Sequence, residues 1–549
     1  MASFSRRIEL GTLFEDVAER GRTTTVHLSR PLDIAPELGT ALDVPAAARL
    51  VQDAAGWFAA AGAGPGDRVA IVKRNHWDLV LLCCAAARIG AVPVPLSAHL
   101  DTDVLEILLK RLDPALLAIG SAQAAAGSAL TSLASRTLLL DGAAGAAGSM
   151  LSLDDVRGHA APAPRRPPVD DPLVVLHTSG TTGVPKLVVH STRTLLRRLA
   201  GFEAHRWPVL ASRRSDVVAG AFSFAHGRAL AWTASVMALG PEKLLVVSGS
   251  GWAEARPLLE RHRPTTVEAQ PSTYVRWRPH VAAQDEPAQN GPAQNEPVRS
   301  RAFDRVRLYI STFDAVHPPT VRTFLNATAH PRPIWLQGWG QSETGPLTFR
   351  FLTRRAMRAE RERHPTTRDL GRPVPGRSRL RVVDRETLRP VPRGTSGLLV
   401  CRTKALCLDY VGERQRYQRK RAGEWFVTGD IGVLTRSGRL LLLDREADGL
   451  PDGSCVELED VIEDRLPGVA ECVVLGVPGG RCVPVLVTED GAPDPALWRA
   501  ATADLPELAD PVALAWDRIP RTGTGKVRRA ALRERLGVTP ETYGTGKWT

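Results

Sequence analysis

The sequence lacks the patterns that mark secreted, zinc-binding and membrane-spanning proteins. Its 549 residues include seven cysteines, none with Cys-x-x-Cys or Cys/His zinc spacing, so we expect reduced thiols and a cytoplasmic protein. The first residues contain no apolar run of the kind that a secretory signal needs. The most apolar stretch, residues 79–96, is interrupted by Arg88, Gly90, Pro93 and Pro95. We therefore expect a buried helix and strand there rather than a membrane span.

Acidic residues are fewer than basic ones, with 59 Asp and Glu against 71 Lys and Arg, and the formal net charge is +12. This excess favours an anionic ligand such as a nucleotide, and it is equally consistent with nucleic acid or with a solvated basic surface. The basic clusters at 354–363 and 414–421 lack the interleaved aromatic residues of a nucleic-acid platform, so we expect no nucleic-acid partner.

Short apolar runs alternate with helical stretches along a chain that is too long for one core of ordinary size. The expected strands are residues 68–72, 91–96, 173–176, 243–247 and 306–310, and a helix is expected at 79–89. This rhythm predicts an α/β protein with mostly parallel strands. Residues 379–400 and 425–443 predict a β-rich subdomain. Residues 142–168 and 284–297 are rich in small residues or Pro and predict loops.

The strongest motif is His177-Thr-Ser-Gly-Thr-Thr-Gly-Val-Pro-Lys186, directly after the apolar run 173–176. Its glycines allow tight turns that offer N–H groups to oxyanions, its hydroxyl side chains add donors, and Lys186 adds a positive charge. Such a loop suits a polyphosphate. It is not a Walker A loop, because Pro185 stands where the second glycine should precede the lysine.

This run resembles the phosphate loop of the adenylate-forming superfamily, which contains acyl- and aryl-CoA synthetases, peptide-synthetase adenylation domains and luciferases. Further motifs match in the family's order: Gln337-Gly-Trp-Gly-Gln-Ser-Glu343, Asp369-Leu-Gly-Arg-Pro-Val-Pro-Gly376, Trp425-Phe-Val-Thr-Gly-Asp430 and Pro520-Arg-Thr-Gly-Thr-Gly-Lys526. The resemblance spans nearly the whole chain. It implies a large adenylation domain at 1–443, built of parallel sheets packed with helices plus the β-rich subdomain, and a small mobile α+β domain at 444–549.

The resemblance implies that an acid oxyanion attacks the α-phosphorus of ATP and releases pyrophosphate, with Mg²⁺ and fixed donors meeting the negative charge. It assigns catalytic roles to Lys526, Glu343, Thr182 and His226, and metal contacts to Glu343 and Thr182. The expected nucleotide-binding residues are Thr178, Ser179, Gly180, Thr181, Thr182, Gly183, Lys186, Asp314, Trp339, Gly340, Ser342, Asp430 and Arg445. The expected acid-binding residues are His226, Phe313 and Gly338. A lone His in an apolar stretch is also often a core residue, which is the alternative for His226.

Two departures from the family pattern bear on the substrates. Ser311-Thr-Phe-Asp-Ala315 replaces the family's Ser-Gly-Gly or Ser-Gly-Ala turn, and Phe313 puts a ring where a long acyl chain would lie, so we expect a small acid. In the hinge Asp444-Arg-Glu-Ala-Asp-Gly-Leu-Pro-Asp-Gly453, Ala447 takes the pivot position, Pro451 replaces a lysine, and the loop is one residue short. Because proline stiffens the backbone, we expect a poorly formed thiol tunnel.

The expected function is therefore ATP-dependent adenylation of a small acid, followed by transfer to an acceptor in the manner of an acyl- or aryl-CoA ligase. CoA and a carrier-protein thiol are the default acceptors. The alternative is activation of nitrite and its transfer to an aryl amine, as in some actinobacterial natural-product enzymes that resemble this family. We do not expect a non-catalytic nucleotide-binding protein, because the chain keeps Lys526, Glu343 and Asp430.

Overall fold

The computed structural model describes residues 8–142, 150–178, 180, 183–205, 207, 209–282, 300–358, 364–446, 453–477, 480–488, 491–538 and 547–548. The chain forms two compact units. Unit 1 comprises 1–268, 342–345 and 404–417, and unit 2 comprises 269–341, 346–403 and 418–549. The predicted boundary between 443 and 444 falls inside unit 2 and stays a prediction.

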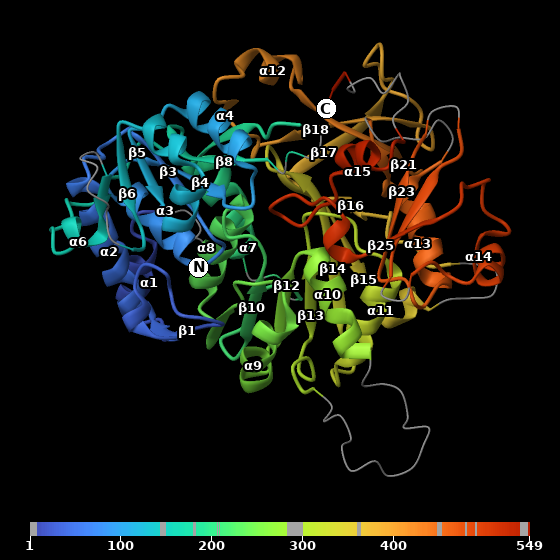
Figure 1. The fold of residues 1–549 in the computed structure, drawn as a ribbon, viewed down its shortest axis with the longest axis horizontal. Coiled ribbons are helices and arrows are strands. Elements are labelled where there is room, and N and C mark those ends of the chain that lie inside the picture. The colour runs from blue at the N-terminus through green and yellow to red at the C-terminus, as the bar shows by residue number, and fades with distance from the viewer. Residues whose placement is uncertain are drawn as a thin grey trace, which may run out of the picture. The chain divides into compact units, whose positions relative to one another are not determined.

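Unit 1 contains a parallel five-stranded sheet in the order β4-β3-β5-β6-β7, drawn in blue to teal in Figure 1. Its strands are β3 (Arg68–Lys73), β4 (Val92–Ser97), β5 (Leu116–Ile119), β6 (Arg136–Leu139) and β7 (Met150–Ser152). The helices α2 (Val44–Ala60), α3 (Asp78–Arg88) and α4 (Thr102–Leu112) belong to the same unit. Residues of α4 pack with β3, β4 and β5 in one apolar cluster. This arrangement confirms the expected α/β class, the strands at 68–72 and 91–96, and the helix near 79–89.

The loop predicted for 142–168 is wrong in part, because β7 and the short helix α6 (Leu153–Val156) lie inside it. The carboxylate of Asp155 accepts hydrogen bonds from the backbone N and Oγ of Ser152 and so caps this helix. Leu153 and Val156 are buried. The other predicted loop, 284–297, lies outside the described residues.

Unit 1 also contains two further groups of strands. The strands β10 (Val217–Ala221), β11 (Lys243–Val246), β1 (Thr25–Leu28) and β2 (Ala41–Asp43) are neighbours in that order. A separate antiparallel sheet has the order β19-β9-β8, with β8 (Pro172–His177), β9 (Leu187–Ser191) and β19 (Asp409–Tyr410). The predicted phosphate loop therefore joins two hydrogen-bonded strands, and the 404–417 segment returns beside them.

Unit 2 contains β13 (Leu308–Ser311), β14 (Ile334–Gln341), β15 (Gly345–Leu352) and β16 (Arg372–Pro373), with the helices α10 (Pro271–Ala282) and α11 (Pro318–Ala327). Buried aromatic rings of Tyr274, Tyr309, Phe324 and Trp335 pack together here. The predicted β-rich subdomain is confirmed as β17 (Ser378–Val383), β18 (Ser396–Thr403), β20 (Arg421–Ala422), β21 (Trp425–Leu434) and β22 (Leu440–Arg445), all antiparallel.

The last part of unit 2 contains α13 (Cys455–Arg465), β23 (Glu471–Leu475), β24 (Val483–Val487), α14 (Pro495–Thr502), β25 (Val512–Leu514) and α15 (Arg529–Arg535). Its two apolar clusters draw all their residues from 455–536. Among the described residues, no helix is both long and apolar enough to cross a membrane.

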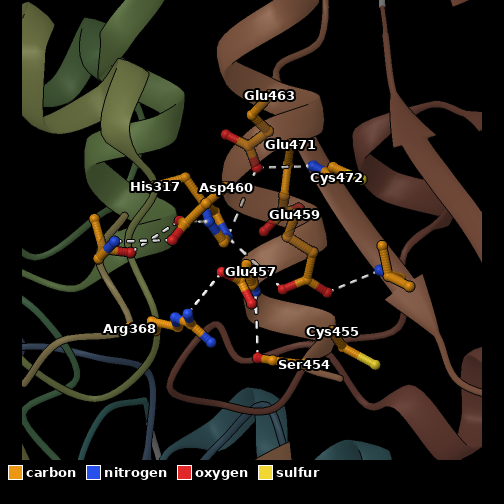
Figure 2. Close-up of polar contacts among 12 residues, drawn as sticks. His317, Arg368, Ser454, Cys455, Glu457, Glu459, Asp460, Glu463, Glu471 and Cys472 are labelled. Carbon is orange, nitrogen blue, oxygen red and sulfur yellow. Dashed lines mark hydrogen bonds and ion pairs between the residues drawn. The ribbon is translucent and has the colours of Figure 1, made fainter. Parts of the chain in front are cut away.

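Charged groups attach α13 to the residues at the start of α11. Figure 2 shows His317 against Asp460, with Glu459 and Glu463 on the same helix, and Nδ1 of His317 lies 2.8 Å from Oδ1 of Asp460. Burial by itself would lower the pKa of His317, but the carboxylates of Glu463, Asp460 and Glu459 outweigh it and raise that pKa to about 10. His317 is therefore a buried cation at physiological pH.

Candidate active site

Two hydrogen bonds between Thr178 and Lys186 join the two ends of the phosphate loop. The N–H of Thr178 donates to the carbonyl of Lys186 at 3.0 Å, and the N–H of Lys186 donates to Oγ1 of Thr178 at 3.0 Å. Gly180 has φ +66° and Gly183 has φ +136°, a region that residues with a Cβ rarely adopt. A Cβ at Gly180 would also lie 2.7 Å from the ring of Pro185. Ser179, Thr181 and Thr182 lie outside the described residues.

Glu343 is held from three directions within unit 1. One carboxylate oxygen, Oε1, lies 3.1 Å from Nζ of Lys186 and accepts a hydrogen bond of 2.7 Å from the hydroxyl of Tyr410. The backbone carbonyl of Glu343 accepts from the N–H of Cys407 at 2.7 Å. Glu343 is only 3% exposed, so its carboxylate is a buried, partnered anion beside the phosphate loop. Tyr410 was not among the residues predicted from the sequence.

Ser342 and His226 also meet in unit 1. Nε2 of His226 lies 3.5 Å from Oγ of Ser342, and Nδ1 of His226 accepts from the backbone N–H of Arg228 at the start of α8 (Gly227–Leu239). Because Nδ1 accepts, Nε2 carries the proton in this tautomer. His190 also holds Ser342 in place, because its Nε2 donates a hydrogen bond of 2.7 Å to the backbone carbonyl of Ser342.

Asp430 on β21 is the centre of a second group, which lies in unit 2. Its Oδ2 accepts from the indole N–H of Trp339 at 3.2 Å and from the amide of Gln341 at 3.0 Å, and Nε of Arg445 lies 3.5 Å from Oδ1. Asp430 is 4% exposed. Three predicted residues thus meet, and the sequence analysis missed Gln341, although it lies inside a matched motif.

Phe313 stands two residues after the end of β13 and has φ +86°, a backbone conformation that costs a bulky residue free energy. Its neighbour Asp314 is exposed. Among the described groups, the buried hydroxyls of Ser311 and Thr312 have no hydrogen-bond partner. The turn that replaces the family's Ser-Gly-Gly therefore combines a strained aromatic residue with unsatisfied polar atoms, as functional sites often do.

The loop that carries Lys526 is a tight hairpin in unit 2. The N–H of Thr522 donates to the carbonyl of Lys526 at 2.8 Å, and the N–H of Lys526 donates back to Oγ1 of Thr522 at 3.2 Å. Gly525 has φ +76°, and a Cβ there would lie 2.1 Å from Oγ of Ser272 and 2.9 Å from Nε2 of Gln270. The glycine thus lets the hairpin pack against the residues that open α10.

The predicted site residues that the structure describes are divided between the two units. Unit 1 contains Thr178, Gly180, Gly183, Lys186, His226, Ser342 and Glu343, and unit 2 contains Phe313, Asp314, Gly338, Trp339, Gly340, Asp430, Arg445 and Lys526. Gly338 lies against the ring of Phe349, since a Cβ there would be 3.0 Å from that ring. Gly340 is exposed. The altered hinge residues 447–452 lie outside the described residues.

A magnesium ion fits the donors around Glu343. Within the described ranges, no group of three or more His, Cys, Asp and Glu side chains is placed to hold a metal. Mg²⁺ does not need one, since it usually binds one or two carboxylates together with substrate phosphates and water. Glu343 supplies one buried carboxylate of this kind next to the phosphate loop.

Comparison with known proteins decides the family. The family described as AMP-binding enzyme matches residues 39–411. The chain belongs to the AMP-binding enzyme family. It is an AMP-forming ligase that uses ATP, and the resemblance inferred from the motifs is confirmed.

Two relatives and one solved structure illustrate the likeness. The chain is 36% identical over 566 residues to 3-amino-2-hydroxy-4-methoxybenzoate diazotase from Streptomyces cremeus, covering 98% of this chain and 97% of the relative. It is 26% identical to feruloyl-CoA synthase from an Amycolatopsis species, covering 91% of this chain and 95% of the relative. The crystal structure of ATP-bound MatB from Rhodopseudomonas palustris has the same fold, with a TM-score of 0.74, 23% identity, and coverage of 96% of this chain and 99% of that one.

Proposed function

We propose that the protein adenylates nitrite with ATP and transfers the activated nitrogen to an aryl amine, yielding a diazonium product in natural-product biosynthesis. The observation that carries the proposal is the full-length likeness to an enzyme named as a diazotase. Phe313 supports it, because a phenylalanine in the turn after β13 occupies volume that a long or bulky acid would need.

The chemistry requires no additional oxidant or reductant. A nitrite oxygen attacks the α-phosphorus, the bond to pyrophosphate breaks, and a mixed anhydride of nitrous acid and AMP forms. The amine nitrogen then attacks the nitroso nitrogen and releases AMP. The amine nitrogen loses a proton, and the resulting N-nitroso compound tautomerises to a diazohydroxide. The diazohydroxide takes up a proton and loses water to give the diazonium ion.

The residues of this chain divide the first step between them. The loop from Thr178 to Lys186 cradles the phosphates, and Asp430, which already accepts two hydrogen bonds, takes the ribose hydroxyls. Lys526, at the end of its hairpin, supplies positive charge to the α-phosphate and the acid oxygen. Glu343, together with Thr182, is the proposed holder of Mg²⁺, which neutralises phosphate charge and polarises the centre under attack.

The small nitrite ion suits the polar lining after β13. The unpartnered hydroxyls of Ser311 and Thr312 offer hydrogen bonds to an acid that is little more than two oxygens. His226, which carries its proton on Nε2 near Ser342, is proposed as a further acid-binding residue. An apolar acyl chain would leave these hydroxyls unsatisfied, and that carries a cost of about 1–3 kcal/mol for each buried group.

We further propose that residues 444–549 form a small domain that changes position between the two half-reactions. We also propose that the protein acts in the cytoplasm. The independent apolar clusters at 455–536 support a separate core.

The second candidate function is ligation of a small carboxylic acid to CoA or to a carrier protein, which the likeness to a CoA synthase favours.

An ATP–pyrophosphate exchange screen tests the first half-reaction. The acids are nitrite, acetate, benzoate and a long-chain fatty acid, each with Mg²⁺, and Lys526→Ala is the control for exchange by the same site. Nitrite-dependent exchange that Lys526→Ala abolishes supports the proposal. Exchange with a carboxylic acid and none with nitrite refutes it in favour of the second candidate.

A further inference from the structure

Tyr410 contacts the candidate site through Glu343, and no motif in the sequence indicates this contact. It lies on the two-residue strand β19, which pairs with β9 directly after the phosphate loop. Tyr410 is 2% exposed, and its hydroxyl donates to Oε1 of Glu343 at 2.7 Å. A phenol hydroxyl is a hydrogen-bond donor and a carboxylate oxygen is an acceptor, so Tyr410 donates to Glu343.

Two donors share the same oxygen of Glu343. Lys186 lies 3.1 Å from Oε1 and also stands over the ring of Tyr410, with Nζ 5.4 Å from the ring centroid. Lys186 is the cation of the phosphate loop, and a triphosphate is a stronger attraction for it than a single carboxylate. When Lys186 turns to the nucleotide, Glu343 loses that contact and keeps the one from Tyr410.

We propose that Tyr410 is a positioning residue that holds the carboxylate of Glu343 for the metal–nucleotide complex once Lys186 has turned to the phosphates. Tyr410 acts through Glu343 and does not touch the substrate. A hydrogen bond that orients a metal-binding carboxylate typically changes metal affinity 10–100-fold when it is removed. The inference rests on the proposed function in one respect, which is that this site binds ATP together with a divalent cation.

Tyr417 provides a matched control in the same segment. Its ring packs edge-on against Tyr410 at 5.3 Å between centroids, and its hydroxyl donates to the carbonyl of Cys407 at 2.8 Å. Tyr417→Phe therefore removes one half-buried phenol hydroxyl from the same 404–417 segment without touching the carboxylate of Glu343. A purely structural role for the phenols predicts similar effects for the two substitutions.

The experiment measures binding directly, by calorimetric titration of Mn²⁺ into the full-length protein saturated with ATP, and of ATP into the protein with EDTA. We expect Tyr410→Phe to weaken Mn²⁺ binding about tenfold, to leave metal-free ATP binding within about twofold of wild type, and to show partial rescue of pyrophosphate exchange at high Mg²⁺. Tyr417→Phe should leave Mn²⁺ affinity unchanged. Mn²⁺ affinity within twofold of wild type in Tyr410→Phe overturns the proposal.

A double-mutant cycle keeps the test decisive if Tyr410→Phe also lowers the melting temperature. In the Glu343→Gln background, the effect of Tyr410→Phe on Mn²⁺ affinity should vanish, because the group through which it acts is gone. An undiminished effect overturns the proposal. Since the Mn²⁺ and ATP binding measurements do not depend on the acid, failure of nitrite to support exchange would reject the proposed function and leave this inference standing.

Discussion

Substitution of Gly525 by alanine tests whether close packing of the Lys526 hairpin is required for adenylation. A Cβ at this position would lie 2.1 Å from Oγ of Ser272 and 3.0 Å from its Cβ. The two side chains must move apart by roughly 1.3 Å or more to reach an ordinary van der Waals contact. The hairpin is then displaced from the residues that open α10, and Lys526 is displaced with it.

Displacement on this scale affects rate more than folding. A misplacement of about 1 Å in a catalytic group can cost about 100-fold in rate. We therefore expect Gly525→Ala to slow pyrophosphate exchange about 100-fold. The positive φ of +76° adds strain of about 1–2 kcal/mol, which is a modest loss of stability for a protein of this size. Calorimetric ATP binding should change little, because the other nucleotide contacts are retained.

Gly537→Ala is the matched control for backbone strain. Gly537 has φ +65°, and a Cβ there would meet nothing within 4 Å. It therefore carries the strain without the clash and should exchange pyrophosphate near the wild-type rate. Adding Ser272→Ala to Gly525→Ala removes the closest atom and should restore part of the activity. Wild-type exchange by Gly525→Ala, or an equal loss in Gly537→Ala, would refute the packing argument.

Three further predictions follow from the geometry. Asp430→Ala should raise the KM for ATP about 10–100-fold and the KM for the acid much less, because two ribose hydroxyls lose a shared acceptor; an unchanged KM for ATP contradicts the ribose assignment. Phe313→Gly should relieve the backbone at φ +86° and admit benzoate-sized acids in the exchange assay; no new acid would show that the ring does not limit the pocket. His317, whose pKa is raised from 6.5 to about 10, contributes stability that is complete below pH 6.5 and disappears as the pH rises through 10. His317→Asn should therefore lower the melting temperature more at pH 7 than at pH 10, and an equal loss at both pH values would contradict the charge assignment.

The parts of the site that could be predicted from sequence are those set by local backbone chemistry. Gly180, Gly183 and Gly525 all have positive φ, and glycine at such positions is visible in a single sequence. The apolar runs before the phosphate loop and in β3 and β4 likewise gave strands near their expected places. The strand expected at 306–310 begins only at Leu308.

The contacts missed by the sequence analysis are set by tertiary packing. β19 has two residues, too few for any periodicity, and reaches β9 from more than 200 positions away, so nothing local marked Tyr410 as a partner of Glu343. Gln341 and His190 carry no signal of their own, because amides and imidazoles serve equally in cores and at surfaces. The helix α6 was hidden because its four residues are surrounded by Ala, Gly and Pro.

Identification of the transferred group tests the central claim most directly. The full-length protein is incubated with ATP, Mg²⁺, ¹⁵N-labelled nitrite, CoA and an aryl amine, and the products are separated and weighed by mass spectrometry. We expect AMP to form in equal amount with a diazonium product that carries one ¹⁵N and is trapped as an azo dye, and we expect no such product with Lys526→Ala. A CoA thioester formed from an added carboxylic acid, with no labelled diazonium, would contradict it.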